Sequence, residues 1–224
     1  MMARDQEQHG ASASIPASVP ESQAGSLPGS QAAAGLRVAQ IRRRDISVRR
    51  FMTGDPIDEV TGLLHRAYAR QRALGLEPLA GRQDSTTTLD RVLASEAYLA
   101  VAGVSSEHAA ARELIVGVIL FNEHEKVTFP TSFLEPETAH FAMFAVDPQL
   151  QGIGVGVMLL EMCEQRATEI GAKRLALSMA EPDASLRRYY ERRDYAFVEY
   201  WQWPYTNYRS VILARPIGSN DAPG

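Results

Sequence analysis

The sequence of 224 residues contains a single cysteine, Cys163, and this scarcity excludes a disulfide framework. No stretch approaches the roughly 20 consecutive apolar residues that a membrane-spanning helix requires. Residues 1–10 lack the apolar core of a secretory signal peptide, so we expect a cytoplasmic protein. The net charge of -4 gives no reason to expect a nucleic-acid partner. No Cys/His cluster has metal-ligand spacing, so no metal site is predicted.

Large apolar side chains are also scarce in residues 1–36, which are rich in Ala, Ser, Gly, Gln and Pro. Such a segment buries too little apolar surface to offset the entropy lost on ordering. We therefore predict a disordered tail over residues 1–36, one domain over residues 37–217 and a flexible C-terminal tail over residues 218–224. A basic stretch near the start of the domain either faces solvent or meets an anionic partner. Its arginines are Arg42, Arg43, Arg44, Arg49 and Arg50.

The most informative stretch runs from His140 to Ile170 and predicts a strand, a glycine-rich loop and a helix. Residues 141–146 form an apolar run typical of a strand buried on both faces, and Asp147-Pro148 ends it. The loop from Gln151 to Gly156 leads into a helix whose apolar residues, Cys163 among them, share one stripe, which favours a buried thiol. Glycines before a helix N-terminus leave free backbone N–H groups beside the positive end of the helix dipole. This arrangement predicts phosphate binding.

Two common phosphate-binding motifs are missing from this loop. Counted from either Gly152 or Gly154, the third glycine of the dinucleotide motif G-x-G-x-x-G is absent, and no lysine of a Walker loop lies nearby. The spacing Gln151-x-x-Gly154-x-Gly156 instead resembles the pyrophosphate loop of the GNAT superfamily, the acyl-coenzyme A-dependent N-acyltransferases. For the loop alone, a glycine-rich connection without a ligand is the alternative interpretation.

Hydrophobic periodicity predicts the order strand, two helices, three strands, helix, strand, helix and two strands. This order alternates less strictly than a doubly wound sheet, so we expect an α/β fold with a mixed sheet. It also resembles the GNAT order over about residues 45–215. The resemblance implies an α+β-type, mostly antiparallel sheet of six to seven strands flanked by about four helices. The expected helices are 57–74, 86–93, 155–170 and 186–193, and the expected strands are 46–51, 97–104, 113–121, 141–146, 174–179, 196–203 and 210–214.

A second motif in the helix after the fifth strand supports the resemblance. GNAT chains commonly carry an Asn, an Ala, a Tyr-Glu pair and a Gly-Phe there. This sequence has Asp183, Leu186, Tyr190-Glu191 and Asp194-Tyr195 at those positions. The retained Tyr190 is therefore the candidate general acid, because a phenol with a pKa of about 10 stays protonated at neutral pH and can serve a departing thiolate. The neighbouring Tyr189 is its alternative, since one of the two tyrosines is expected in the core.

The resemblance further implies acetyl-CoA as the co-substrate. Its diphosphate would contact the backbone of the loop residues Gln151, Gly152, Ile153, Gly154, Val155 and Gly156. Its pantetheine chain would add to the preceding strand at Phe144, Ala145 and Val146, as in strand augmentation.

His140 is the candidate general base, because an unperturbed pKa of about 6.5 suits proton transfer near neutrality. A histidine that merely faces solvent is the alternative, and Glu137 is the reserve. His65 and His124 are further candidates for the acceptor pocket, although a surface position is favoured for both. We expect that pocket between residues 74–85 and the final hairpin. The charges there select no substrate class, so a small-molecule amine and a peptide are both possible acceptors. A homodimer is also possible.

The leading hypothesis is an N-acetyltransferase that moves an acetyl group from acetyl-CoA to a primary amine through a tetrahedral intermediate. The departures at Asp183 and Asp194 sustain an alternative, a CoA-binding module with a sensing or partner-binding role and no catalysis. A nucleotide-binding protein of another α/β class is disfavoured by the failed glycine count.

Overall fold

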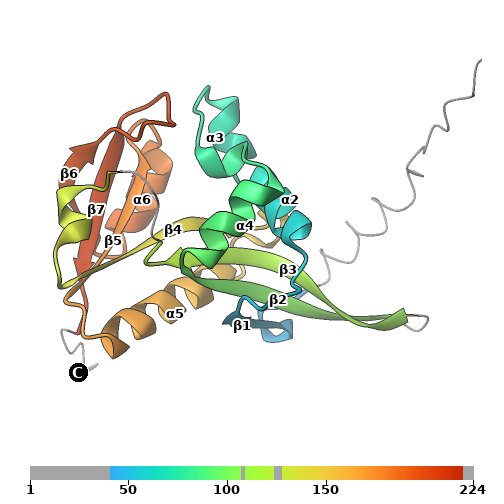
Figure 1. Cartoon of the computed structure of the whole chain (residues 1–224). Helices are drawn as coiled ribbons and strands as arrows, with labels where there is room; N and C mark the ends of the chain where they lie inside the picture. Colours follow the sequence, from blue (N-terminus) through green and yellow to red (C-terminus); the bar gives the residue numbers. More distant parts are fainter. Residues whose placement is uncertain (1–40, 107–108, 124–127, 219–224) are drawn as a thin grey trace, which may run out of the picture.

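The computed structural model describes residues 41–106, 109–123 and 128–218, which form a seven-stranded sheet flanked by helices (Figure 1). The strand order is β1-β2-β3-β4-β5-β7-β6, and only the β4–β5 pair is parallel. The strands are β1 (Ile46–Arg50), β2 (Glu96–Ser106), β3 (Ala109–Phe121), β4 (Thr138–Val146), β5 (Arg174–Ala180), β6 (Ala196–Trp201) and β7 (Ser210–Pro216). The α-helices are α2 (Ile57–Ala67), α3 (Ala69–Ala73), α4 (Ser85–Leu93), α5 (Val155–Glu169) and α6 (Ala184–Glu191).

Both faces of the sheet are covered, which explains the apolar runs in its central strands. In β2, Tyr98 and Ala100 pack into the core on the side of α5, whereas Leu99 and Val101 pack against α2. Successive side chains of a strand point to opposite faces, so a strand buried on both sides needs apolar residues at every position. The expected mixed, mostly antiparallel sheet is confirmed.

Cys163 is fully buried in α5, as its place on the apolar stripe predicts. Burial raises the pKa of its thiol, which keeps the group protonated and unreactive. Within the described residues, no helix is long and apolar enough to cross a membrane. The tail expected over residues 1–36 falls outside the described residues, and the proposed domain boundaries stay predictions.

The observed helix boundaries differ from the expected ones, most of all in the first helix. The helix expected over residues 57–74 is interrupted at Tyr68, which separates α2 from α3. Asp55, which stands just before α2, accepts hydrogen bonds from the Arg49 guanidinium and the Met52 N–H, so its carboxylate closes a turn instead of capping the helix. The helix α4 is capped by Asp84, whose Oδ1 accepts the Thr87 N–H at 2.8 Å. Asp, Ser and Thr all suit an N-cap, so the sequence alone does not tell which of several neighbouring residues caps a helix.

The feature that positions the site is the separation of β4 from β5. These parallel strands pair only from Thr138↔Arg174 to Phe141↔Leu177, although both strands continue beyond that point. Strand β4 also carries a bulge, because two of its residues, Met143 and Phe144, stand opposite the single Ile119 of β3. Met143 has a left-handed φ of 46°, so the bulge bends β4 where the strands part.

Candidate active site

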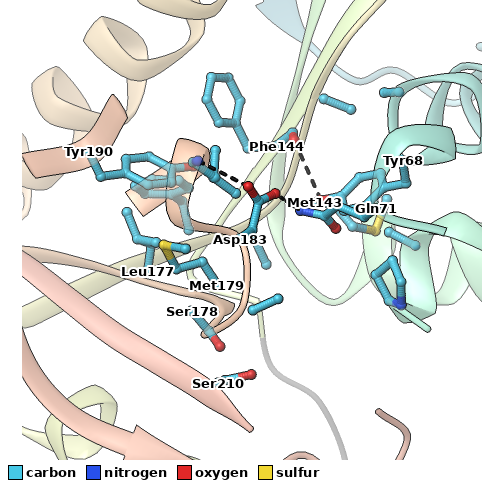
Figure 2. A pocket seen from close by; sticks show the side chains of 18 of the residues that line it. Tyr68, Gln71, Met143, Phe144, Leu177, Ser178, Met179, Asp183, Tyr190 and Ser210 are labelled. Atoms are coloured by element: carbon cyan, nitrogen blue, oxygen red, sulfur yellow. Dashed lines mark hydrogen bonds between the residues drawn. The ribbon is translucent and has the colours of Figure 1, made fainter. Parts of the chain in front are cut away.

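A cavity of about 820 Å³ opens where β4 and β5 separate. Residues 142–146 of β4 line one wall, and residues 177–180 of β5 line the other. The glycine loop and α6 contribute one end, and the loops before α4 and between β6 and β7 contribute the opposite end. Figure 2 shows the Asp183 carboxylate between Tyr190 on one wall and Gln71 on the other.

The glycine loop has the backbone conformation that its composition requires. Gly152 and Gly154 have φ values of 85° and 99°, a region that residues with a Cβ rarely occupy. Gly154 is the N-cap of α5, so the first N–H groups of the helix point toward the cavity end without intrahelical partners. A Cβ at Gly156 would lie 3.1 Å from the Phe144 ring, which explains the third glycine. The glycine loop therefore packs directly against the bulge of β4.

Arg43 also lies at this loop, a position that the sequence did not predict for it. A Cβ at Gly154 would approach the Cδ atom of Arg43 to 3.2 Å and its Nε atom to 3.4 Å. The guanidinium is exposed and makes no ion pair with any described residue. The basic stretch did suggest an anionic partner, but only the fold shows which of its arginines reaches the positive end of α5.

The predicted strand residues Phe144, Ala145 and Val146 all line the cavity. Ala145 and Val146 pair with β3, whereas the edge that faces β5 has no strand partner beyond Phe141 in the described part of the sheet. That open edge is what strand augmentation by a ligand requires. The Tyr68 hydroxyl lies 3.5 Å from the Phe144 carbonyl oxygen, and burial raises the pKa of Tyr68 to about 12.

The two adjacent tyrosines of α6 have different surroundings. Tyr190 packs against the rings of Phe141 and Tyr195, yet it lines the cavity. Its hydroxyl is not sealed from solvent and has no hydrogen-bond partner among the described residues. The Tyr189 hydroxyl lies 3.6 Å from the position that a Cβ on Gly156 would occupy. The Arg193 guanidinium lies over the Tyr189 ring, 3.8 Å from its centroid. Tyr189 is therefore at the loop end, and Tyr190 is deeper.

Burial raises the pKa of Tyr190 well above 10, and the neighbouring hydroxyls of Tyr68, Tyr189 and Tyr195 raise it further. The phenol consequently stays neutral at physiological pH and keeps a proton to donate.

Asp183 occupies the position where an asparagine is common. Its Oδ1 accepts the Leu186 N–H at 3.1 Å, as an N-cap does, and its carboxylate also accepts hydrogen bonds from Arg70 at 2.7 Å and Gln71 at 3.2 Å. Burial alone raises the pKa of Asp183, but these hydrogen bonds outweigh it and leave a net lowering. The ionised carboxylate therefore joins α6 to α3 across the cavity.

Asp194 stands where a glycine is usual and adopts a left-handed φ of 63°. Residue 194 thus keeps the left-handed backbone conformation that favours glycine, although it is an aspartate. Asp tolerates the left-handed region better than most residues do.

His140 is buried and lines the cavity, so the solvent-facing alternative is wrong. Its Nε2 lies 3.1 Å from the Glu123 carbonyl oxygen, which can only accept, so Nε2 carries the proton. The ring stacks on Phe133 with the centroids 4.5 Å apart. The reserve base Glu137 is exposed and is absent from the cavity wall.

The other two histidine candidates do not reach the cavity wall in the described residues. His65 Nε2 lies 2.8 Å from the Gln83 carbonyl oxygen, away from the cavity. His124 lies outside the described residues. No group of three or more His, Cys, Asp or Glu side chains in the described part of the chain could hold a metal ion.

The two loops expected to flank the acceptor pocket contact each other. Asn207 accepts the Glu77 N–H at 2.9 Å and donates to the Gly75 carbonyl at 2.8 Å, while Arg82 donates to the Tyr205 carbonyl at 2.7 Å. The loop before α4 and the β6–β7 connection therefore contact each other, and the placement of an acceptor between them stays a prediction.

The acetyltransferase (GNAT) family model matches residues 73–195, which include β4, the glycine loop, α5 and Tyr190. The chain belongs to the GNAT family. Members of this family are acyl-CoA-dependent N-acetyltransferases. Comparison with curated proteins gave no significant match.

Solved GNAT structures share this fold at low sequence identity. The ribosomal-protein-S18-alanine N-acetyltransferase from Escherichia coli is 15% identical with a TM-score of 0.53, and the match covers 80% of this chain and 98% of that one. The acetyltransferase yncA from Salmonella typhimurium, solved with its cofactor acetyl-CoA, has 15% identity, a TM-score of 0.52 and the same coverage. An acetyltransferase from Streptococcus agalactiae has 14% identity and a TM-score of 0.55, covering 78% of this chain and 99% of its own. These likenesses support the fold.

Proposed function

We propose that this GNAT protein transfers the acetyl group of acetyl-CoA to the primary amine of an acceptor by direct attack. The observation that carries the proposal is the placement of Tyr190 and the glycine loop at one cavity, with the open edge of β4 between them. A diphosphate at the loop and a thioester near Tyr190 are the two ends of one extended ligand. The solved yncA structure contains acetyl-CoA, which agrees with this choice of ligand.

The cofactor end supplies charge and backbone donors. The N–H groups at the start of α5 would bind the diphosphate, and the glycines would let the backbone approach it. Arg43 would add a positive charge beside Gly154, where its side chain already lies. Phe144, Ala145 and Val146 would hold the pantetheine along the open edge of β4, and a backbone N–H of this strand would donate to the oxyanion.

The reaction balances with one acid and one base. The acceptor ammonium loses a proton to the His140 imidazole, and the free amine attacks the acetyl carbonyl carbon to form a tetrahedral intermediate. Collapse of the intermediate breaks the C–S bond, and the departing thiolate takes the proton of Tyr190. The nitrogen loses its second proton as the amide forms, which restores the Tyr190 phenol, and the proton first taken from the ammonium passes from His140 to solvent. The products are an N-acetylated amine and free CoA.

Two measurements test this proposal. Isothermal titration should detect binding of acetyl-CoA and no comparable binding of NADH or ATP. Release of the CoA thiol should then depend on an added primary amine. Tight binding of acetyl-CoA without amine-dependent thiol release would instead favour a non-catalytic CoA-binding module, and preferential binding of NADH or ATP would refute the cofactor assignment.

A further inference from the structure

The end of the cavity away from the glycine loop carries a set of aromatic rings, here called the aromatic wall. Its members come from three separate segments and all line the cavity: Phe129, Phe133, His140, Trp203 and Tyr205. The rings contact one another in ordered geometries. Phe133 stacks on His140 at 4.5 Å, Trp203 stacks on Tyr205 at 5.7 Å, and Phe129 meets Trp203 edge-on at 5.8 Å. Such a surface offers flat apolar area and ring edges to a ligand.

The aromatic wall is held in place by the surrounding structure. The Trp203 Nε1–H donates to the Ser178 hydroxyl at 2.9 Å, which fixes the indole against β5. His140 is anchored by its bond to the Glu123 carbonyl, and Phe133 is buried beneath it. A rigid aromatic surface binds a flat ligand with little additional loss of side-chain entropy.

The charges near the aromatic wall are already neutralised. Glu123 and Asp183 are the carboxylates that line the cavity among the described residues. Glu123 is buried and forms a bidentate pair with Arg91, with N–O distances of 2.5 and 2.8 Å, and Asp183 is paired with Arg70. No carboxylate of the described cavity is left to hold a second ammonium group of an acceptor, and Arg70 and Arg91 are equally committed. The third arginine of the cavity wall, Arg193, lies against the Tyr189 ring at the glycine-loop end and not at the aromatic wall. A polycation or a zwitterion would therefore enter without a partner for its extra charge.

We propose that the acceptor is an aromatic primary amine with a single positive charge, whose ring packs on the aromatic wall. This inference rests on the proposed acetyl transfer. The ring binds in the half of the cavity opposite the glycine loop and places the amine beside His140.

The test compares kcat/KM for CoA thiol release with four amines. These are 2-phenylethylamine, n-butylamine as the aliphatic control, spermidine as the polycation and phenylalanine as the zwitterion. We expect 2-phenylethylamine to exceed each of the others by at least about tenfold, or about 1.4 kcal/mol. Equal values for butylamine, or a preference for spermidine or phenylalanine, would overturn the inference and leave the proposed acetyl transfer standing.

A variant pair and a binding measurement sharpen the test. Trp203→Leu should remove most of the preference for 2-phenylethylamine over butylamine, whereas Trp201→Leu should retain it, because Trp201 is not part of the cavity wall. Isothermal titration of CoA-loaded protein with 2-phenylethylamine separates the two claims. Binding without turnover would support the aromatic site and refute acetyl transfer, and neither binding nor turnover would refute the aromatic site.

Discussion

The role of Tyr190 can be tested by the single substitution Tyr190→Phe. The change keeps the ring that packs on Phe141 and Tyr195 and removes only the hydroxyl. That hydroxyl has no hydrogen-bond partner among the described residues, so its loss leaves no buried group unpaired. We expect the free energy of unfolding to change by less than about 0.5 kcal/mol, within the range of substitutions that disturb no specific feature.

The effect on turnover should be much larger than the effect on stability. Loss of a general acid lowers a rate by about 10² to 10⁴, which corresponds to about 2.7 to 5.5 kcal/mol of transition-state stabilisation. The affinity for acetyl-CoA should be nearly unchanged, because the proton is donated only as the thiolate leaves. Burial raises the pKa of Tyr190 well above 10, so in the wild type this acid stays protonated throughout the alkaline range. Its ionisation should therefore cause no fall in kcat up to about pH 10.

Steady-state thiol release and isothermal titration with acetyl-CoA together measure these effects, and Tyr189→Phe is the matched control. Its hydroxyl lies beside Gly156, so its removal should raise KM for acetyl-CoA a few-fold and leave kcat intact. If Tyr190→Phe retains kcat within a few-fold, Tyr190 is only a core residue. If Tyr189→Phe is the damaging change, the acid has been assigned to the wrong tyrosine.

Three further substitutions test the cavity. Gly154→Val should weaken acetyl-CoA binding at least about tenfold by titration, whereas Gly171→Val, at a similar positive φ after α5, should lower stability alone. Arg43→Ala should weaken acetyl-CoA binding about three- to tenfold, with a smaller effect at high salt, and the exposed Arg44→Ala should not. Asp183→Asn retains the helix cap but loses the ion pair with α3, so the free energy of unfolding should fall by about 1 kcal/mol at pH 7. The pKa of Asp183 is lower in the folded protein than in the unfolded chain, where it is about 3.9. The stability that the ion pair contributes is therefore fully present above this unfolded pKa and is lost as the pH falls through the folded pKa. At that pH the free energies of unfolding of the wild type and Asp183→Asn should converge.

The fold was largely predictable because its signals are local. The apolar runs of β3, β4 and β5 and the stripe of α5 are dictated by burial on both faces of one sheet. The glycine loop was equally predictable, since Gly152 and Gly154 adopt the left-handed conformations that glycine permits. Most of the residues predicted to bind the cofactor are neighbours in the sequence and line one cavity, whereas Ile153 and Val155 are absent from its wall.

The parts that sequence reasoning missed depend on contacts between distant segments. Arg43 reaches Gly154 across more than a hundred residues, and nothing in its local sequence distinguishes it from Arg44. The aromatic wall likewise combines Phe129 with Trp203, which become neighbours only when β4 and β5 pair. The break of the first helix at Tyr68 follows no proline or glycine, and it places the Tyr68 hydroxyl near the Phe144 carbonyl. A periodic pattern carries no information about such tertiary contacts.

The departures from the common GNAT pattern are compatible with catalysis for a physical reason. An asparagine and an aspartate cap a helix equally well, and Asp183 does so while its charge is neutralised by Arg70. Asp194 keeps the left-handed backbone that a glycine would have, so the turn after α6 is preserved. Both substitutions thus maintain the conformation that presents Tyr190 to the cavity. What Asp183 adds is an ionic link between α6 and α3, which an uncharged asparagine could not form with Arg70.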